Sequence, residues 1–386
     1  MDTKWRYEKI GDVCIVERGG SPRPIDSYIT EDSNGINWIK IGDTDSSMYI
    51  TKTEQKIKPE GMKKSRYVKP GDFLLSNSMS FGRPYILKID GCIHDGWLVL
   101  RDEQELFDKR FLYYYLSSKS TYQKFKAMAV GGVVNNLNSE MVRKVEVPVP
   151  EKDIQIQVAD MLDKVSGVVS MRKQQLQKLD ELVKSRFIEL FGECEEHKRL
   201  GEYASLITKG ASPKWQGVDY CEDGTLFVTS ENVREGYLDL SKRKYLDDKI
   251  NEIQPRSILK RNDILINIVG ASIGRAAVYD CDEVANINQA VALVRVDYSQ
   301  INQTYLMTFL NSPQAIEMYG KMKKGGARDN LSLQNIADLQ IPVAPMELQN
   351  QFADFVEQTD KSKLAVQQSI AELEELKKSL MQKYFG

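Results

Sequence analysis

The stretch VPVPEKDIQIQVADMLDKVSGVVSMRKQQLQKLDELVKSRFIELFG, residues 147–192, returns in altered form as IPVAPMELQNQFADFVEQTDKSKLAVQQSIAELEELKKSLMQKYFG at residues 341–386. The two segments align without a gap at a shift of 194 residues, and fourteen of their positions are identical. Self-similarity at one fixed shift is the signature of a repeated architecture. The sequence therefore predicts a tandem duplication.

The duplication extends toward the start of each copy, where the alignment needs small gaps. "VERGGSP" ending at Pro22 matches "ITKGASP" ending at Pro213, and "GDFLLSNSMSFGR" matches "NDILINIVGASIGR". Similarity is high at the ends of each copy and low between them. We infer two copies whose middles have diverged.

Each copy begins with a segment of mixed character, at residues 1–150 and 193–344. Short runs rich in β-branched and aromatic residues are separated by Gly, Pro, Asn and Asp. A helical stretch follows near residues 111–126 in the first copy and 305–322 in the second. This pattern predicts an α+β globular domain in each copy.

The matched segments predict two long helices, at residues 151–192 and 345–386. No proline follows Pro150 or Pro345 within them, and leucines recur every three or four residues. This spacing is typical of a helix that packs along one face or in a coiled coil.

Antiparallel packing of these helices would explain why the centre and the end of the sequence are alike. A helix of this length is a rod of roughly 58 Å. "RFIELFG" at 186–192 would then reach the second domain, and "LMQKYFG" at 380–386 would reach the first. The predicted fold is α+β, with two globular domains separated by two long antiparallel helices under approximate twofold symmetry.

Composition limits the class of protein. The 386 residues are 41% hydrophobic, enough for two ordinary globular cores. No apolar run reaches the ~18 residues of a membrane span, and the start MDTKWRYEK lacks a signal-peptide core, so we expect a soluble, cytoplasmic protein. The five cysteines are scattered and never form a CxxC pair, which is typical of structural thiols in a reducing compartment.

The net charge of −2 excludes a uniformly basic surface for nucleic acid. A DNA-binding surface would have to be local. Three basic clusters are candidates, and each also fits an ordinary solvated face. They are Lys63-Lys64-Ser65-Arg66, Lys242-Arg243-Lys244, and Lys321 with Lys323, Lys324 and Arg328.

These features resemble the specificity (S) subunits of type I restriction-modification systems, along essentially the whole chain. The resemblance is carried by the alternation of domains and long helices, by the helix entries "VRKVEVPVP" and "IADLQIPVAP", and by "ITKGASP" and "VGASIGR". The first copy departs from the pattern, with "SNSMSFGRP" in place of "VGASIGRAA" and "HDGW" in place of "INQA".

The resemblance implies a non-catalytic subunit that reads a bipartite double-stranded DNA target, with one half-site per domain. It also implies helices that set the spacing and dock two methyltransferase subunits, with restriction subunits joining through the complex. S-adenosylmethionine is then expected on the methyltransferase subunits, and no cofactor on this chain. Since the two domains differ in sequence, the two half-sites should differ as well.

Other function classes have less support. A self-sufficient adenine methyltransferase would need an Asn-Pro-Pro-Tyr-like motif and a glycine-rich cofactor loop, and the sequence has neither. With only His94 and His197, histidine-based catalysis and metal binding have little to work with. Asp45, Glu54 and Lys56 imitate a nuclease core at a spacing that is common by chance. A coiled-coil scaffold that does not bind DNA would explain the helices but not the divergence of the domains.

Loops at equivalent places in each domain are expected to approach the DNA grooves, while Lys and Arg hold phosphates. In the first domain the candidates are Ser21, Arg23, Lys40, Asp43, Ser78, Ser80, Arg83, Asn135 and Asn136. In the second domain they are Ser212, Lys214, Trp215, Ser230, Asn232, Ser272, Arg275, Lys324, Arg328 and Asn330. Arg83 and Arg275 equally fit a role in bracing a turn, and Asn136 and Asn330 a role in shaping the loop after Gly-Gly.

Overall fold

The computed structural model describes residues 5–77, 82–129, 136–322 and 329–386. The chain forms two compact units, one of residues 1–173 with 369–386 (unit 1) and one of residues 174–368 (unit 2). Five of the candidate DNA-contacting residues lie outside the described residues: Ser78, Ser80, Asn135, Lys324 and Arg328.

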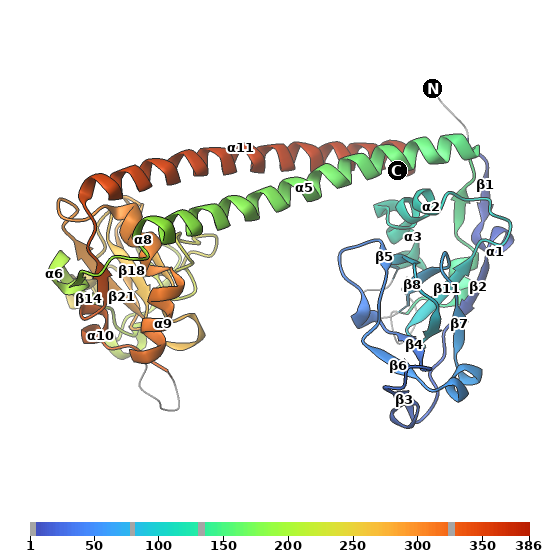
Figure 1. Cartoon of the computed structure of the whole chain (residues 1–386), viewed down its shortest axis with the longest axis horizontal. Helices are drawn as coiled ribbons and strands as arrows, with labels where there is room; N and C mark the ends of the chain where they lie inside the picture. Colours follow the sequence, from blue (N-terminus) through green and yellow to red (C-terminus); the bar gives the residue numbers. More distant parts are fainter. Residues whose placement is uncertain (1–4, 78–81, 130–135, 323–328) are drawn as a thin grey trace. The chain divides into compact units, whose positions relative to one another are not determined.

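Two long helices are shared between the units, α5 (Lys152–Phe191) and α11 (Met346–Phe385), and each has 40 residues (Figure 1). In unit 1, Phe385 at the end of α11 is buried in one core with Val158 and Leu162 of α5. In unit 2, Phe191 at the end of α5 is buried with Phe352 of α11. The predicted antiparallel arrangement is confirmed, because each unit holds the start of one long helix and the end of the other.

Ion pairs between the two long helices occur in both units. Lys173 Nζ lies 2.8 Å from a carboxylate oxygen of Glu374 in unit 1, and Lys363 Nζ lies 2.7 Å from Asp180 in unit 2. The Lys173–Glu374 pair is exposed on both sides and Asp180 is exposed as well, and ion pairs in contact with water contribute little to stability. The buried aromatic residues at the helix ends therefore hold the helices in place.

Unit 1 contains two five-stranded sheets and a two-stranded one. The first sheet has the order β2 (Ile15–Arg18), β11 (Trp97–Arg101), β8 (Phe73–Ser76), β9 (Pro84–Leu87) and β5 (Tyr49–Ile50). The second has the order β3 (Ile29–Thr30), β6 (Gln55–Ile57), β4 (Ile36–Ile39), β10 (Gly91–Ile93) and β7 (Arg66–Val68). β1 (Tyr7–Lys9) pairs with β12 (Glu146–Pro148).

Unit 2 repeats this plan with fewer strands. One sheet has the order β14 (Ala204–Lys209), β21 (Val291–Val296), β18 (Ile264–Asn267) and β19 (Ala276–Val278). The other has the order β15 (Tyr220–Cys221), β17 (Tyr245–Leu246), β16 (Thr225–Val228) and β20 (Ala285–Ile287), and β13 (His197–Arg199) pairs with β22 (Gln340–Pro342). The parallel pair β16–β20 corresponds to β4–β10 of unit 1.

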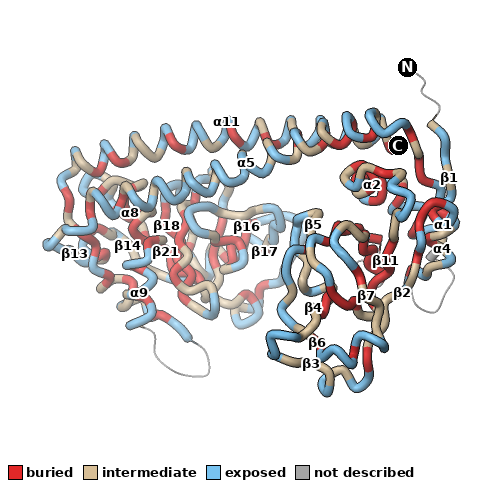
Figure 2. The backbone as a smooth tube through the Cα atoms, turned by 45° about the vertical axis from the view of Figure 1, so that its right-hand side comes forward, coloured by how far each residue is buried: buried red, intermediate tan, exposed pale blue. Residues whose placement is uncertain are grey.

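Short helices complete each unit, and buried residues concentrate in the sheets and in the helices packed on them (Figure 2). Unit 1 has α1 (Ile10–Val13), α2 (Lys109–Leu116), α3 (Lys119–Ala129) and α4 (Ser139–Arg143). Unit 2 has α6 (Leu200–Tyr203), α7 (Lys249–Ile253), α8 (Gln303–Leu310), α9 (Pro313–Met322) and α10 (Leu333–Ala337).

A buried glutamine fastens each long helix to the domain beside it. Gln155 accepts a hydrogen bond from the N–H of Asp108, the N-cap of α2, at 2.8 Å, and its amide donates to the carbonyls of Leu106 and Pro150. Gln349 accepts from the N–H of Asn302, the N-cap of α8, at 2.9 Å. This shared role explains why glutamine stands at both positions of the repeat.

We expect Gln155→Ala to lower the free energy of unfolding by about 1–3 kcal/mol, because it leaves buried backbone groups without a partner. Urea unfolding followed by circular dichroism measures the change. Gln157→Ala is the matched control, since Gln157 and its counterpart Gln351 are identical too but exposed. Equal losses in the two variants would contradict the role given to Gln155.

Candidate nucleic-acid interface

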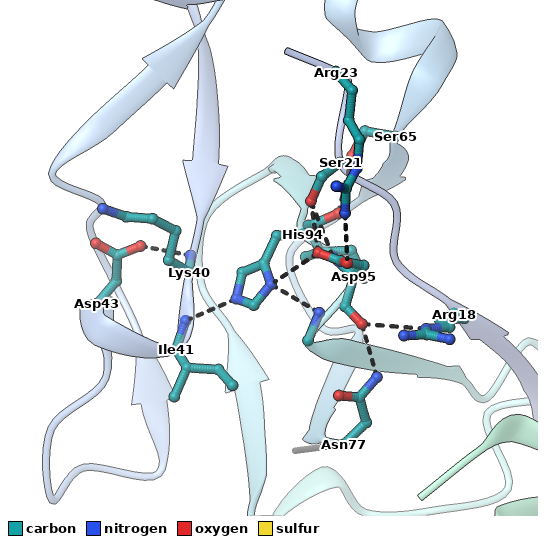
Figure 3. A network of polar contacts seen from close by, with 12 residues as sticks. Arg18, Ser21, Arg23, Lys40, Ile41, Asp43, Ser65, Asn77, His94 and Asp95 are labelled. Atoms are coloured by element: carbon teal, nitrogen blue, oxygen red, sulfur yellow. Dashed lines mark hydrogen bonds and ion pairs between the residues drawn. The ribbon is translucent and has the colours of Figure 1, made fainter. Parts of the chain in front are cut away.

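The candidate interface of unit 1 is built at the carboxyl ends of two parallel strands. β4 and β10 run side by side, so the residues that follow them, Lys40 and His94, emerge at the same edge of the sheet. The loop after β2 closes over this edge, where Gly20 N–H donates to the Ile93 carbonyl at 3.1 Å. Loops from three parts of the sequence therefore meet at one place (Figure 3).

His94 lies between two of these loops. Its Nδ1 lies 2.7 Å from the N–H nitrogen of Gly96, and its Nε2 lies 3.2 Å from that of Ile41. A neutral imidazole accepts at one nitrogen only, so the shorter contact marks Nδ1 as the acceptor. Burial lowers the pKa of His94, which favours the neutral ring that this contact needs.

Asp95 binds two side chains of the loop after β2. Its Oδ1 accepts a hydrogen bond from Ser21 Oγ at 2.7 Å, and its Oδ2 lies 3.6 Å from a guanidinium nitrogen of Arg23. Its carbonyl accepts from the amide of Asn77 at 2.8 Å. The hydrogen bond from Ser21 is the main cause that lowers the pKa of Asp95, so the group is a carboxylate at neutral pH.

Four of the candidates from the sequence thus meet around His94 and Asp95, namely Ser21, Arg23, Lys40 and Asp43 (Figure 3). Among them, Asp43 accepts from the N–H groups of Lys40 and Glu54, so its carboxylate shapes the turn. Sequence reasoning missed His94 and Asp95 as site residues. The only signal was that "HDGW" replaces "INQA" at this point of the repeat.

Ser21, Asp95 and His94 do not form a nucleophilic triad. In such a triad the histidine lies between the serine and the acid and takes the serine's proton. Here Ser21 donates to Asp95. The arrangement can hold loops in place, but it does not activate Ser21.

Unit 2 places its corresponding loop in the same way. A Cβ on Gly19 would lie 2.1 Å from the carbonyl oxygen of His94, and one on Gly210 would lie 1.7 Å from that of Ile287. Both loops can pass the strand end this closely only because both positions are glycine. Each then buries a proline and exposes a cation, as Pro22-Arg23 in unit 1 and Pro213-Lys214 in unit 2.

The β8–β9 and β18–β19 strand pairs are closed in the same way at Arg83 and Arg275. Ser76 N–H donates to the Arg83 carbonyl at 3.1 Å, and Asn267 N–H to the Arg275 carbonyl at 2.9 Å. The side chains differ, however. The Arg83 guanidinium donates to the Asp45 carbonyl at 3.1 Å and lies over the Tyr85 ring, whereas none of the described residues forms an ion pair or hydrogen bond with the Arg275 guanidinium.

Asn267, which sequence reasoning did not select, organises the loops of unit 2. Its buried amide donates to the Ser230 carbonyl at 3.0 Å and to Ser272 Oγ at 3.1 Å. Asn232 is itself only 7% exposed, and its amide binds Thr229 and the Asp239 carbonyl. Its side chain therefore shapes this loop from within, and a contact between Asn232 and DNA stays a prediction.

The remaining described candidates have few contacts. Asn136 and Asn330 are exposed after the Gly-Gly segments, and Asn330 forms an isolated bridge with Val269. Ser212 is the N-cap residue of the short helix Pro213–Gln216, without a side-chain cap. Trp215, on the same turn, is 83% exposed.

Two of the three basic clusters contain ion pairs with acidic neighbours, and Lys323, Lys324 and Arg328 of the third cluster lie outside the described residues. Arg66 lies 3.1 Å from Glu17, Arg243 lies 2.6 Å from Glu283, and Lys244 lies 3.1 Å from Glu231. The paired cations fit solvated faces better than phosphate-binding sites. Within residues 5–77, 82–129, 136–322 and 329–386, no three His, Cys, Asp or Glu side chains come together as a metal site, and no helix has the length and apolarity to cross a membrane.

Known proteins share this architecture. The family model for the type I restriction modification DNA specificity domain matches the chain twice, at residues 2–181 and 196–375. The chain belongs to this family. The two matches confirm the family and the duplicated fold that the sequence indicated, and they favour DNA target recognition over a scaffold that does not bind DNA.

Individual members of the specificity family align along most of the chain. The type I restriction enzyme EcoBI specificity subunit of Escherichia coli is 24% identical, over 91% of this chain and 80% of that protein. The MjaVIII specificity subunit of Methanocaldococcus jannaschii is 20% identical, over 98% and 91%. A chain from a structural study of complex assembly and conformational transition in the type I R-M system gives a TM-score of 0.71 at 18% identity, covering 100% of this chain and 98% of that one, which shows a common fold.

We expect unit 1 to lose stability as the pH falls through the range in which His94 titrates. The folded-state pKa of His94 is lowered, so its contribution is present above the unfolded value of about 6.5 and is lost as the pH falls through the folded value. Unfolding of the wild type and of His94→Asn between pH 7.5 and 5 measures this loss. In the structure, Asn288 follows β20 as His94 follows β10, and the N–H of each donates to the carbonyl that ends the neighbouring parallel strand, so the substitution is one that the fold accommodates. The two proteins should differ in slope, and equal slopes would contradict the role of His94.

Proposed function

We propose that this chain is the non-catalytic subunit that reads a bipartite DNA target, with one half-site per unit. The observation that carries the proposal is the repeated loop at residues 19–23 and 210–214. Its backbone approaches the strand end in the same way in both units, but the side chains around it differ. A common frame with different side chains reads different bases, so the two half-sites differ from each other.

Methyl transfer belongs to partner subunits in this proposal. The sequence has no Asn-Pro-Pro-Tyr-like motif and no glycine-rich cofactor loop. S-adenosylmethionine therefore binds to methyltransferase subunits, and restriction subunits join through the same complex in the cytoplasm. The network around His94 and Asp95 supports this division of labour, because it shapes a surface and activates no nucleophile.

The long helices carry a duplicated surface that the fold does not explain. Glu181, Leu182, Lys184 and Ser185 of α5 recur as Glu375, Leu376, Lys378 and Ser379 of α11, and all eight are exposed. Leu182 and Leu376 are each 48% exposed. We call these residues the repeated helix patches. Identity at buried positions such as Gln155 and Gln349 serves the fold, whereas identity at exposed positions fits a shared partner.

Two identical partners fit two identical patches. Each patch surrounds an apolar leucine with polar and charged side chains, so the leucine can form the apolar centre of an interface and the polar side chains its rim. One methyltransferase subunit binds to each patch, so the complex contains two methyltransferase subunits for each copy of this chain. The loops at the sheet edges remain available to DNA.

We expect the purified chain alone to transfer no methyl groups and to bind DNA weakly, and two methyltransferase subunits to restore both activities. Leu182→Glu or Leu376→Glu should each reduce the complex from 2:1 to 1:1, because a charge replaces the apolar centre of one patch. Native mass spectrometry measures the stoichiometry, and transfer of labelled methyl groups measures the activity.

The control is Met171→Glu, which changes an apolar residue of α5 that is 61% exposed but not repeated in α11. This variant should keep the 2:1 complex. A chain that methylates DNA by itself would contradict the proposed function. A 2:1 complex that survives the double variant Leu182→Glu/Leu376→Glu would refute the docking site alone.

A further inference from the structure

Trp215 is exposed to a degree that the fold does not account for. It is 83% exposed, whereas Trp38 and Trp97 are 3% and 0% exposed. Trp5 stacks on Tyr384, with parallel rings whose centroids lie 6.2 Å apart. Burying an indole removes a large apolar area from water and stabilises a fold. Trp215 contributes almost none of this stabilisation to unit 2.

The backbone around Trp215 is nevertheless well fixed. Trp215 N–H donates to the Ser212 carbonyl at 3.1 Å, and Val218 N–H donates to the Pro213 carbonyl at 3.1 Å. Pro213 and Val218 are buried on either side of the turn, and Gly217 closes it with a φ of 65°, a left-handed conformation that favours glycine. The ring is therefore held outward on a rigid support, and little backbone entropy is lost when a ligand covers it.

The chemistry beside the ring indicates which ligand this is. Lys214 is exposed, and no ion pair reaches it from the part of the chain that the structure describes. It occupies the place of Arg23 in unit 1, directly after the buried proline. A fixed aromatic ring next to a free cation suits nucleic acid, because the ring stacks on a base and the cation neutralises a phosphate.

We propose that Trp215 stacks on a base of the half-site read by unit 2, with Lys214 on a neighbouring phosphate. This inference rests on the proposed function, since it requires that unit 2 reads DNA. A ring can reach a base face in duplex DNA only where a base step opens, and such steps bend the duplex. Flexible pyrimidine–purine steps open at the lowest cost in free energy. The half-site of unit 2 therefore contains a pyrimidine–purine step where Trp215 inserts.

Unit 1 has no aromatic ring at the corresponding position. Pro24 stands where Trp215 stands in unit 2, and Arg23 before it is drawn toward Asp95. Proline offers no aromatic face. The opened step therefore occurs in one half-site only, and the two half-sites differ in local DNA shape as well as in sequence.

The test uses the full chain in complex with its methyltransferase subunits. The DNA is an unmethylated duplex that contains the sequence found to be methylated in cells. 2-Aminopurine replaces each adenine of the two half-sites in turn, except the adenine that becomes methylated, because methyltransferases flip that base out of the duplex themselves. With the wild-type chain, its fluorescence should change on binding at one step of the unit 2 half-site and at no step of the other. Trp215→Ala should abolish that change and weaken binding about tenfold to a hundredfold. Trp215→Phe, which keeps a ring, should retain part of both.

Val284→Ala serves as the control, since Val284 is another apolar residue of unit 2 with 58% exposure, and it precedes the amino end of β20 rather than following its carboxyl end. It should bind DNA as the wild type does. Unchanged affinity and fluorescence for Trp215→Ala would overturn the proposal.

A second outcome would also overturn it. If Trp215→Ala weakens assembly with the methyltransferase subunits but leaves the fluorescence change intact, the ring belongs to a protein interface. A wild-type complex that binds no DNA would instead refute the proposed function, and the stacking with it. The two failures are therefore distinguishable.

Discussion

Burial of one phenylalanine at the end of each long helix is the interaction on which the rest of this structure depends. Phe385 packs edge-on against Phe111, with ring centroids 5.3 Å apart, and Phe191 packs against Tyr305 at 4.6 Å. Phe111 and Tyr305 occupy equivalent positions of the repeat, so the same contact is made twice. Since Phe385 ends the chain's last helix and Phe111 lies in its first domain, this contact fixes the antiparallel order of the helices within unit 1.

A frame fixed in this way leaves the loops free to differ. The glycines, buried prolines and strand ends of the two units match, because they determine where the backbone passes. The polar side chains do not match: unit 1 uses His94 and Asp95, and unit 2 uses Asn267 with Ser230 and Ser272. The loops of each unit are therefore held in place by a different group of polar side chains. A substitution among the polar side chains of one unit changes the DNA-reading loops of that unit and leaves those of the other unit unchanged.

The fold was largely predictable because the sequence contains an internal repeat, and an internal repeat can be detected without a structure. The gap-free match of 147–192 with 341–386 predicted helices at 151–192 and 345–386, and α5 and α11 begin and end within one residue of these bounds. The site was less predictable. Arg23 and Lys214 follow from the shared "SP" motif, but Asn232 is buried and Asp43 shapes a turn. His94 and Asp95 meet Ser21 only through strand pairing between residues far apart in the sequence, which no local pattern reveals.

The central claim, that each unit reads its own half-site, is tested most directly by sequencing the methylated bases in cells. Cells that carry the methyltransferase subunits would express either this chain or a chimera in which residues 1–146 come from a relative with a different target. The account predicts that one half-site of the methylated sequence changes and the other stays. A chimera that methylates efficiently but changes both half-sites together, or neither, would contradict it.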